Sequence, residues 1–181
     1  MVYVLFGTGF EEIEAVTPCD LLRRAGIEVR LIGVDGKIVT GGHGIAIECD
    51  GTLEDVDLAQ REMIVLPGGS VGVASLRASE QALELVRAFS DAGKYVAAIC
   101  AAPTILAQLH LTDGRLVTLY PGLEDQMGSS ILVPETEAVQ DGKLITGTSA
   151  GCAIDFSLQL ITALKGKAAA EEVAQAIVYR R

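Results

Sequence analysis

The sequence lacks long apolar runs, an excess of basic residues and tryptophan, and it has only two histidines, His43 and His110. Its apolar runs, such as MIVLP, are far shorter than the ~20 residues that a membrane span needs, so no membrane association is expected. The first residues, MVYVLF, are typical of a strand and show no basic region or cleavage site of a signal peptide, which predicts a cytoplasmic protein. A formal net charge of −10 argues against binding to a nucleic-acid backbone.

Cysteine is present, but its pattern is not that of a metal site. The four cysteines are far apart in the sequence, with no C-x-x-C pair and no cysteine–histidine cluster, so neither a structural zinc ion nor another metal is expected. Separated cysteines in a chain without a signal peptide are expected to be free thiols. Cys19, Cys49 and Cys152 are interpreted as packing residues, whereas the neighbours of Cys100 suggest another role.

Strand-like and helix-like segments alternate along the chain, and no linker or internal repeat divides residues 1–181, which predicts one domain. Continuous apolar strands separated by helices predict a doubly wound α/β fold, with a mainly parallel sheet and helices on both faces. The expected strands are 2–7, 27–34, 62–69, 95–100 and 114–122, the helices are 11–26, 80–94, 101–110, 152–166 and 168–180, and the hairpins are 36–51 and 131–147, the latter with its turn at Asp141–Gly142.

Ligands of such folds bind at the carboxyl ends of the strands, where we expect residues 7–9, Gly68–Gly69 and Cys100 to lie on one edge. The GTGFEE stretch begins like a dinucleotide-binding fingerprint, but Glu12 stands where the third glycine belongs. Acidic residues at that helix start would repel a pyrophosphate. NAD-dependent and kinase chemistry are therefore disfavoured.

The stretch YVAAICAAPTIL raises two alternatives for Cys100. A free cysteine is most often a buried packing residue. A nucleophile between a strand and a helix, however, is typical of a nucleophile elbow, and a helix N-terminus would lower the pKa of the thiol. Ala101 and Ala102 leave room for a sharp turn, and Pro103 suits the first helical turn. The context favours a reactive thiol.

A reactive thiol needs an acid or a base beside it, and the first helix offers better candidates than the histidines. His110 lies at the far end of the following helix, and His43, on a glycine-rich hairpin, is either near the strand ends or solvated. Glu11 and Glu12 are expected to interact with the helix dipole from outside. Glu14 is the carboxyl expected to point inward, where burial would raise its pKa and keep it protonated.

The blocks GFEEIEAVTPCDLLRRAG, VLPGG and AICAAPTIL, in this order and spacing, resemble the ThiJ/PfpI superfamily. Within it they are similar to the Parkinsonism-associated deglycase branch and its bacterial YajL-like members. The resemblance implies a flavodoxin-like sandwich, usually a homodimer, with Cys100 as the elbow cysteine and Glu14 as the protonated glutamate. It also implies that the N–H groups of Gly69 and Ala101 form an oxyanion site.

The sequence departs from the family pattern near the expected site. Where many members have a histidine, the VTLYP block has Tyr120, and Ala101 follows the cysteine where protease and amidotransferase branches have C-H-G. Protease and amidotransferase activities are therefore disfavoured. The GTSAGCA stretch lacks the arginine that some members carry near Cys152, although Thr148 or Ser149 could offer a hydroxyl group to a ligand.

The resemblance implies two functions. The first is a cofactor-independent enzyme of the glyoxalase III or deglycase type, which acts on small reactive dicarbonyls and converts methylglyoxal to lactate. The second is a redox sensor or an oxidative-stress chaperone whose Cys100 is oxidised without turnover. The first expects a small-molecule carbonyl substrate, and neither requires a metal or cofactor.

Overall fold

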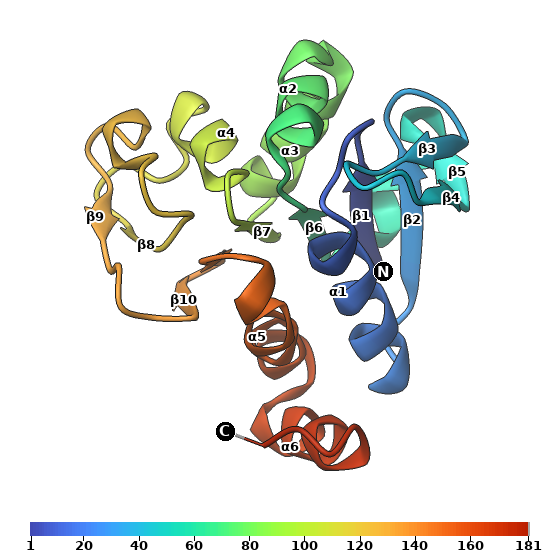
Figure 1. Cartoon of the computed structure of the whole chain (residues 1–181), viewed down its shortest axis with the longest axis vertical. Helices are drawn as coiled ribbons and strands as arrows, with labels where there is room; N and C mark the ends of the chain where they lie inside the picture. The colour runs from blue at the N-terminus through green and yellow to red at the C-terminus, as the bar shows by residue number, and fades with distance from the viewer. Residues whose placement is uncertain (181) are drawn as a thin grey trace.

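A seven-stranded sheet forms the centre of the computed structural model, which describes residues 1–180 (Figure 1). Its strand order is β10–β11–β7–β6–β1–β2–β5, and all neighbours are parallel except the antiparallel pair β10–β11. Two small sheets, β3–β4 and β8–β9, lie outside it. The strands are β1 Val2–Phe6, β2 Val29–Gly33, β3 Ile38–Thr40, β4 Ala46–Glu48, β5 Gly51–Thr52, β6 Met63–Leu66, β7 Tyr95–Ile99, β8 Leu116–Val117, β9 Ile131–Leu132, β10 Ala138–Asp141 and β11 Leu144–Gly147.

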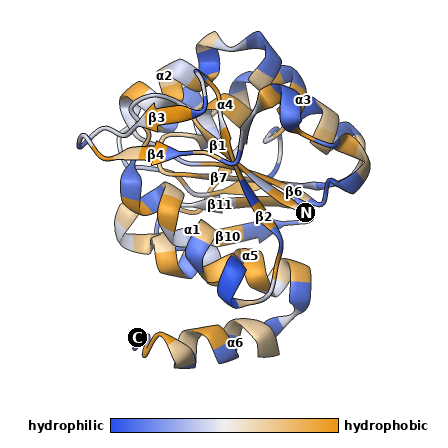
Figure 2. Cartoon of the chain, turned by 90° about the vertical axis from the view of Figure 1, so that its right-hand side faces the viewer, coloured by the Kyte–Doolittle hydropathy of each residue, from blue (hydrophilic) through white to orange (hydrophobic). Residues whose placement is uncertain are grey.

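Helices cover both faces of the sheet, as Figure 2 shows. Helices α1 and α5 pack on one face, where α6 packs against the outer side of α5, and α2, α3 and α4 pack on the other face. The α-helices are α1 Glu12–Arg24, α2 Ser70–Ala78, α3 Glu80–Asp91, α4 Pro103–Gln108, α5 Ala153–Lys165 and α6 Lys167–Ala176, and the 3-10 helices are η1 Leu53–Asp55, η2 Leu58–Gln60, η3 Glu124–Gln126 and η4 Ala150–Cys152. The sequence-based expectation of a doubly wound α/β fold is confirmed.

Alternation along the strands explains this layering. In β1, Val2, Val4 and Phe6 belong to the core shared with α1 and α5, whereas Tyr3 and Leu5 belong to the core shared with α2 and α3. All five side chains are fully buried. Each contributes roughly 1.5–3 kcal/mol of hydrophobic stabilisation, which explains why the strand is apolar throughout rather than alternating with polar residues.

The segment expected as a strand at 114–122 differs from that expectation, since only Leu116 and Val117 form a strand, which pairs in parallel with β9. After Val117 the backbone N–H groups donate to acceptors that are not part of a β-sheet hydrogen-bond pattern. The N–H of Thr118 donates to Thr146 Oγ1 at 2.9 Å, and the N–H of Tyr120 donates to the carbonyl of Cys100 at 2.9 Å. The segment therefore crosses the sheet edge instead of extending the sheet.

Other elements also differ in detail from the sequence-based expectations. Residues 131–132 pair with β8, so the second hairpin is β10–β11, with its turn at Asp141–Gly142 as expected. Helix α2 was not expected, because the stretch after Gly69 is short and rich in small residues. None of the helices in residues 1–180 is both long and apolar enough to span a membrane.

Helix α2 lies unusually close to the loop that follows β1. The N–H of Gly72 donates to the carbonyl of Gly9 at 3.0 Å, and a Cβ atom at Gly72 would lie 2.7 Å from the Cα atom of Phe10. Both neighbours are backbone, which cannot move aside as a flexible side chain can. Glycine is therefore required at position 72 for the α2 N-terminus to reach the carboxyl edge of the sheet.

Replacing Gly72 by alanine is expected to lower the free energy of unfolding by about 1–3 kcal/mol, because the added methyl group overpacks this contact. Urea unfolding of the variant and the wild type measures the difference. Gly151→Ala is the matched control, since the nearest atom to a Cβ there lies 3.8 Å away. Equal destabilisation by the two substitutions would contradict the close approach.

Candidate active site

Cys100 lies in a sharp turn between β7 and α4 at the carboxyl edge of the sheet. Its φ of 65° falls in the left-handed region, which costs a non-glycine residue roughly 1–3 kcal/mol. Two backbone hydrogen bonds hold the turn. The N–H of Cys100 donates to the carbonyl of Gly147 at 2.9 Å, and its carbonyl accepts from the N–H of Tyr120 at 2.9 Å. The structure thus places a partly buried thiol on a strained turn.

Glu14 reaches the same place from helix α1 and is fully buried. Its Oε2 accepts a hydrogen bond from the N–H of Gly68 at 2.9 Å, whereas its buried Oε1 accepts none from an N–H or O–H group of residues 1–180. A Cβ at Gly68 would lie 2.5 Å from Glu14 Oε2 and 2.7 Å from Cys100 Cβ. The missing side chain of Gly68 therefore lets the carboxyl approach the thiol.

Burial raises the pKa of Glu14 to about 7, from an ordinary 4.5. A hydrogen bond with the Cys100 thiol opposes this rise, the charge of Glu11 adds to it, and the N–H of Gly68 opposes it. The carboxyl therefore titrates close to neutral pH. Its protonated form can donate a hydrogen bond to sulfur, and its ionised form can accept a proton.

Burial also raises the pKa of the Cys100 thiol, and an ionised Glu14 raises it further. The N–H groups of Gly69 and Ala101 lower it, but less strongly. The sequence-based expectation of a lowered pKa is therefore wrong in direction, because the packing around the elbow outweighs the N–H groups. When the thiol proton moves to Glu14, the net charge of the pair stays at −1. The protonated carboxyl then donates a hydrogen bond to the thiolate, so no carboxylate repels the ionised sulfur.

The N–H groups of Gly69 and Ala101 face the sulfur because the carbonyl groups of the same two peptide bonds are held by hydrogen bonds elsewhere. A trans peptide group directs its N–H and C=O in opposite directions, and residues 1–180 contain no cis bond. The carbonyl of Gly68 accepts from the N–H of Glu11 at 3.1 Å, and this fixes the N–H of Gly69. The hydrogen bond from Tyr120 to the carbonyl of Cys100 fixes the N–H of Ala101 in the same way.

The structure corrects the expectation that Glu12 lies outside the fold. Glu12 is buried, and its carboxylate accepts from the N–H of His43 at 2.7 Å and lies 2.7 Å from His43 Nδ1. Burial favours a higher pKa of Glu12, but the hydrogen bonds with His43 outweigh it and lower the pKa. The same contact raises the pKa of His43, whose side chain remains largely exposed. His43 thus anchors the β3–β4 hairpin to α1.

Tyr120 contacts the elbow through its backbone, and its side chain is half exposed at 50%. His110 ends the segment after α4, where its Nδ1 lies 3.1 Å from Asp113 Oδ2 on the surface. Both histidines therefore have a carboxylate partner other than Glu14.

The expected hydroxyl groups follow β11. The Thr148 hydroxyl lies 2.7 Å from Thr118 Oγ1 and also donates to the carbonyl of Thr136, so the threonine network occupies it. Ser149 Oγ lies 3.8 Å from Cys152 Sγ. Of the two, Ser149 is the hydroxyl with fewer protein partners.

One group of side chains has the chemistry of a metal site. The ligand atoms of Glu11, Glu12 and His43 lie within 4.8 Å of one another. All three groups already have protein partners, because Glu11 accepts the N–H of Glu14 at 2.8 Å and Glu12 contacts His43. These three side chains thus cap the start of α1 and attach the β3–β4 hairpin to it.

Sequence reasoning did not recognise Gly68 as a partner of Glu14. The available signal was the pair of glycines, Gly68 and Gly69, after a buried strand. A side chain at Gly68 would collide with Glu14 and Cys100, and Gly69 adopts a positive φ. Gly69 has a φ of 87°. Glycine is therefore needed at the two positions for different physical reasons, whereas the pattern of residue types alone indicates only a turn.

Comparison with known proteins agrees with this architecture. A model described as the DJ-1/PfpI family matches residues 1–163. Drosophila melanogaster protein dj-1beta is 35% identical over 177 residues, covering 97% of this chain and 95% of the relative. The crystal structure of Drosophila melanogaster DJ-1beta has a TM-score of 0.94 and 34% identity, covering 99% of this chain and 98% of the relative.

Two further relatives are similar over most of their length. The structure of oxidised Toxoplasma gondii DJ-1 has a TM-score of 0.93 and 33% identity, covering 99% of this chain and 98% of that one. A deglycase of Pyrococcus abyssi is 30% identical over 165 residues, covering 91% of this chain and 99% of the relative.

The raised pKa of Glu14 predicts a pH dependence of stability that Glu14→Gln removes. Because the folded-state pKa is about 7 and the ordinary value is 4.5, the folded protein keeps a proton that the unfolded chain releases between these values. This contribution to stability is fully present below pH 4.5 and is lost as the pH rises through 7.

Relative to Glu14→Gln, the wild type is therefore expected to lose about 2–3 kcal/mol of unfolding free energy between about pH 4.5 and pH 7.5. Urea unfolding across this range measures the loss. The glutamine keeps a carbonyl oxygen as acceptor for the N–H of Gly68. Parallel pH profiles of the two proteins would show that Glu14 titrates normally.

Proposed function

The chain belongs to the DJ-1/PfpI family, and on that premise we propose that it is a cofactor-independent cysteine enzyme that acts on small reactive dicarbonyls or their adducts. The observation that carries the proposal is the contact of a buried carboxyl, Glu14, with the Cys100 thiol beside two converging N–H groups. The deglycase name of the Pyrococcus abyssi relative supports this substrate class. The AICAAPTIL block supports placement among the bacterial YajL-like members.

The proposed reaction converts methylglyoxal and water to lactate. The Cys100 thiolate attacks the aldehyde carbon, a carbon–sulfur bond forms, and the carbonyl oxygen takes the proton from Glu14 to give a hemithioacetal. During the attack, the N–H groups of Gly69 and Ala101 stabilise the negative charge that develops on this oxygen. Glu14 then removes the proton from the former aldehyde carbon and returns it to the adjacent carbon, while the hydroxyl proton on the former aldehyde oxygen passes to the ketone oxygen, which gives a thioester. Water cleaves the thioester, releasing the hydroxy acid and the thiol.

This chemistry suits a site without an imidazole. The proton moves between neighbouring carbon atoms, so a group that titrates near neutral pH can act as both acid and base, and Glu14 has that property. Amide hydrolysis instead needs a general acid placed at the leaving nitrogen, a task that cysteine proteases give to histidine. Ala101 follows the cysteine where the protease and amidotransferase branches have C-H-G, and Tyr120 stands where many family members have a histidine, which supports the dicarbonyl reaction over proteolysis.

A second candidate function is a redox sensor or oxidative-stress chaperone. The partial burial of Cys100 leaves the sulfur accessible to a small oxidant. Peroxide would transfer one oxygen atom to the thiolate to give sulfenic acid and hydroxide, and Glu14 could then hydrogen-bond the new oxygen. The structure of a relative, Toxoplasma gondii DJ-1, in its oxidised form supports this candidate.

We also propose that the chain forms a homodimer. Four large apolar side chains are exposed on α1 and the β3–β4 hairpin, which the contact between Glu12 and His43 holds together. They are Ile13 at 54%, Val16 at 42%, Ile38 at 71% and Ile45 at 54% exposed. An exposed apolar group of this kind is a common feature of protein interfaces.

Lactate formation from methylglyoxal is the test of the enzymatic proposal. We expect Cys100→Ser to lower kcat/KM by about 1,000-fold or more, because the hydroxyl is a far weaker nucleophile at neutral pH. Glu14→Gln is expected to lower kcat by about 100-fold, since proton transfer is lost while the shape is kept. Lactate formation undiminished in both variants would contradict this site, and no turnover by the wild type would contradict the activity.

Peroxide separates the two candidate functions. If the protein is a redox sensor, dilute hydrogen peroxide oxidises Cys100 before the other three cysteines, because Cys19 and Cys49 are buried and Cys152 lies beside the Ser149 hydroxyl rather than beside a buried carboxyl such as Glu14. Mass spectrometry of the cysteine peptides measures the order of oxidation. Preferential oxidation together with no turnover would support the sensor, whereas oxidation of Cys152 before Cys100 would contradict it.

A further inference from the structure

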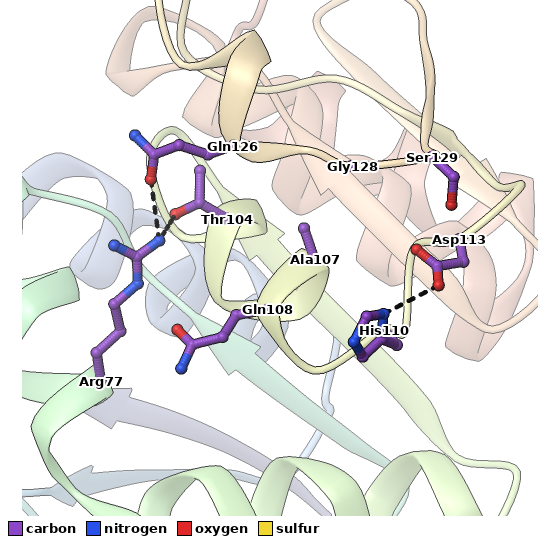
Figure 3. Close-up of a pocket in the computed structure, with 9 residues that line it drawn as sticks. All are labelled: Arg77, Thr104, Ala107, Gln108, His110, Asp113, Gln126, Gly128 and Ser129. Atoms are coloured by element: carbon purple, nitrogen blue, oxygen red, sulfur yellow. Dashed lines mark hydrogen bonds and ion pairs between the residues drawn. The ribbon is translucent and has the colours of Figure 1, made fainter.

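Helix α2 reaches the elbow at both of its ends. Gly69 at its start supplies one N–H group that faces the sulfur, and Arg77 in its last turn reaches helix α4, where its Nη2 donates to Thr104 Oγ1 at 2.6 Å (Figure 3). We propose that Arg77 and Thr104 are positioning residues that hold the N–H of Ala101 against the thiol of Cys100. The proposal deepens the proposed function and rests on it.

A chain of hydrogen bonds connects the guanidinium group to the elbow. The Thr104 hydroxyl donates to the carbonyl of Ala101 at 2.6 Å, and the N–H of Thr104 donates to the same carbonyl at 3.2 Å. A hydroxyl has one proton to donate, so the Thr104 oxygen acts as acceptor towards Arg77 and as donor towards Ala101. Thr104 is buried at 2% exposure, and a charged donor strengthens both bonds in such surroundings.

This chain of hydrogen bonds restricts the backbone of Ala101, whose N–H group faces the thiol. The peptide group before Ala101 is held by the N–H of Tyr120, and the peptide group after it is held by Thr104. With both peptide planes fixed, the φ and ψ angles of Ala101 have little freedom, and its N–H keeps one direction. The strained φ of the neighbouring Cys100 makes such restraint necessary, because an unrestrained turn would relax.

Arg77 has a charge that is not used for an ion pair. Within residues 1–180, no carboxylate lies within 4.0 Å of its guanidinium group, and its second acceptor is the neutral Gln126 Oε1 at 3.2 Å. Carboxylates are abundant in this chain, which has a net charge of −10. The shorter of the two hydrogen bonds of the charged guanidinium group is therefore the one to the Thr104 hydroxyl.

The surroundings of Arg77 allow the proposal to be tested without emptying the core. With Thr104, Gln108 and Gln126, Arg77 lines an open surface cavity of about 440 Å³, shown in Figure 3. Replacement of the arginine therefore leaves space that water can fill. Thr104→Val keeps the shape of the side chain and removes the hydroxyl, whereas Thr104→Ser keeps the hydroxyl, so these two variants form a matched pair.

The experiment follows the alkylation rate of Cys100 by iodoacetamide against pH, with mass spectrometry of the Cys100 peptide as the readout. We expect Thr104→Val and Arg77→Met to move the midpoint of the profile upwards by about one pH unit, which makes alkylation about tenfold slower below the wild-type midpoint. Thr104→Ser is expected to stay within about twofold of the wild type. Arg87→Met, at an exposed arginine on α3, is the charge control and is expected to match the wild type.

Alkylation needs no substrate turnover, so this test is independent of the dicarbonyl reaction. Wild-type profiles in Thr104→Val and Arg77→Met would overturn the proposal, and so would equal impairment of Thr104→Ser and Thr104→Val. If Thr104→Val does not fold, Arg77→Met against Arg87→Met decides the question. Where the wild type does produce lactate, the positioning role expects a lower kcat with an unchanged KM. Absence of lactate with shifted alkylation profiles would refute the proposed function alone.

Discussion

The hydrogen bond from the N–H of Gly68 to the buried carboxyl of Glu14 ties the first helix to the turn after β6, and the candidate site is built around this contact. A second bond, from the N–H of Glu11 to the carbonyl of Gly68, joins the same two segments. Burying a carboxyl is unfavourable when it is charged, so the same contact that assembles the site also raises the pKa of Glu14 towards neutrality. Assembly and acid–base chemistry thus have one physical origin.

The two layers of helices contribute different chemistry to the thiol. Helix α1, on one face, provides the carboxyl, and helix α2, on the other, has Gly69 as its N-cap residue and Arg77 in its last turn. The elbow lies between them at the edge of the sheet, where both layers can reach it. In the proposed reaction this arrangement needs no histidine, because burial gives Glu14 the near-neutral pKa that an imidazole has intrinsically.

Local patterns were sufficient where a segment's structure depends on its own residues. The strand–cysteine–proline order around Cys100 and the turn at Asp141–Gly142 are of this kind, and both have the expected local structure. Expectations were wrong where distant partners decide. The segment at 114–122 leaves the sheet because its donors bond to Thr146 and Cys100, and Glu12 is buried because the hairpin brings His43 to it.

The sequence by itself determined the order of strands and helices apart from α2 and the segment 114–122, the family, and the placement of Cys100 and Glu14 as candidates, because these follow from periodicity, local turn chemistry and ordered blocks. Only the tertiary structure decided the direction of the thiol pKa, the hydrogen-bond partner of Glu14 and the chain from Arg77 through Thr104 to Ala101. The physical reason is that burial and hydrogen-bond geometry depend on groups brought together from distant parts of the chain, as Glu14 and Gly68 are from 54 positions apart.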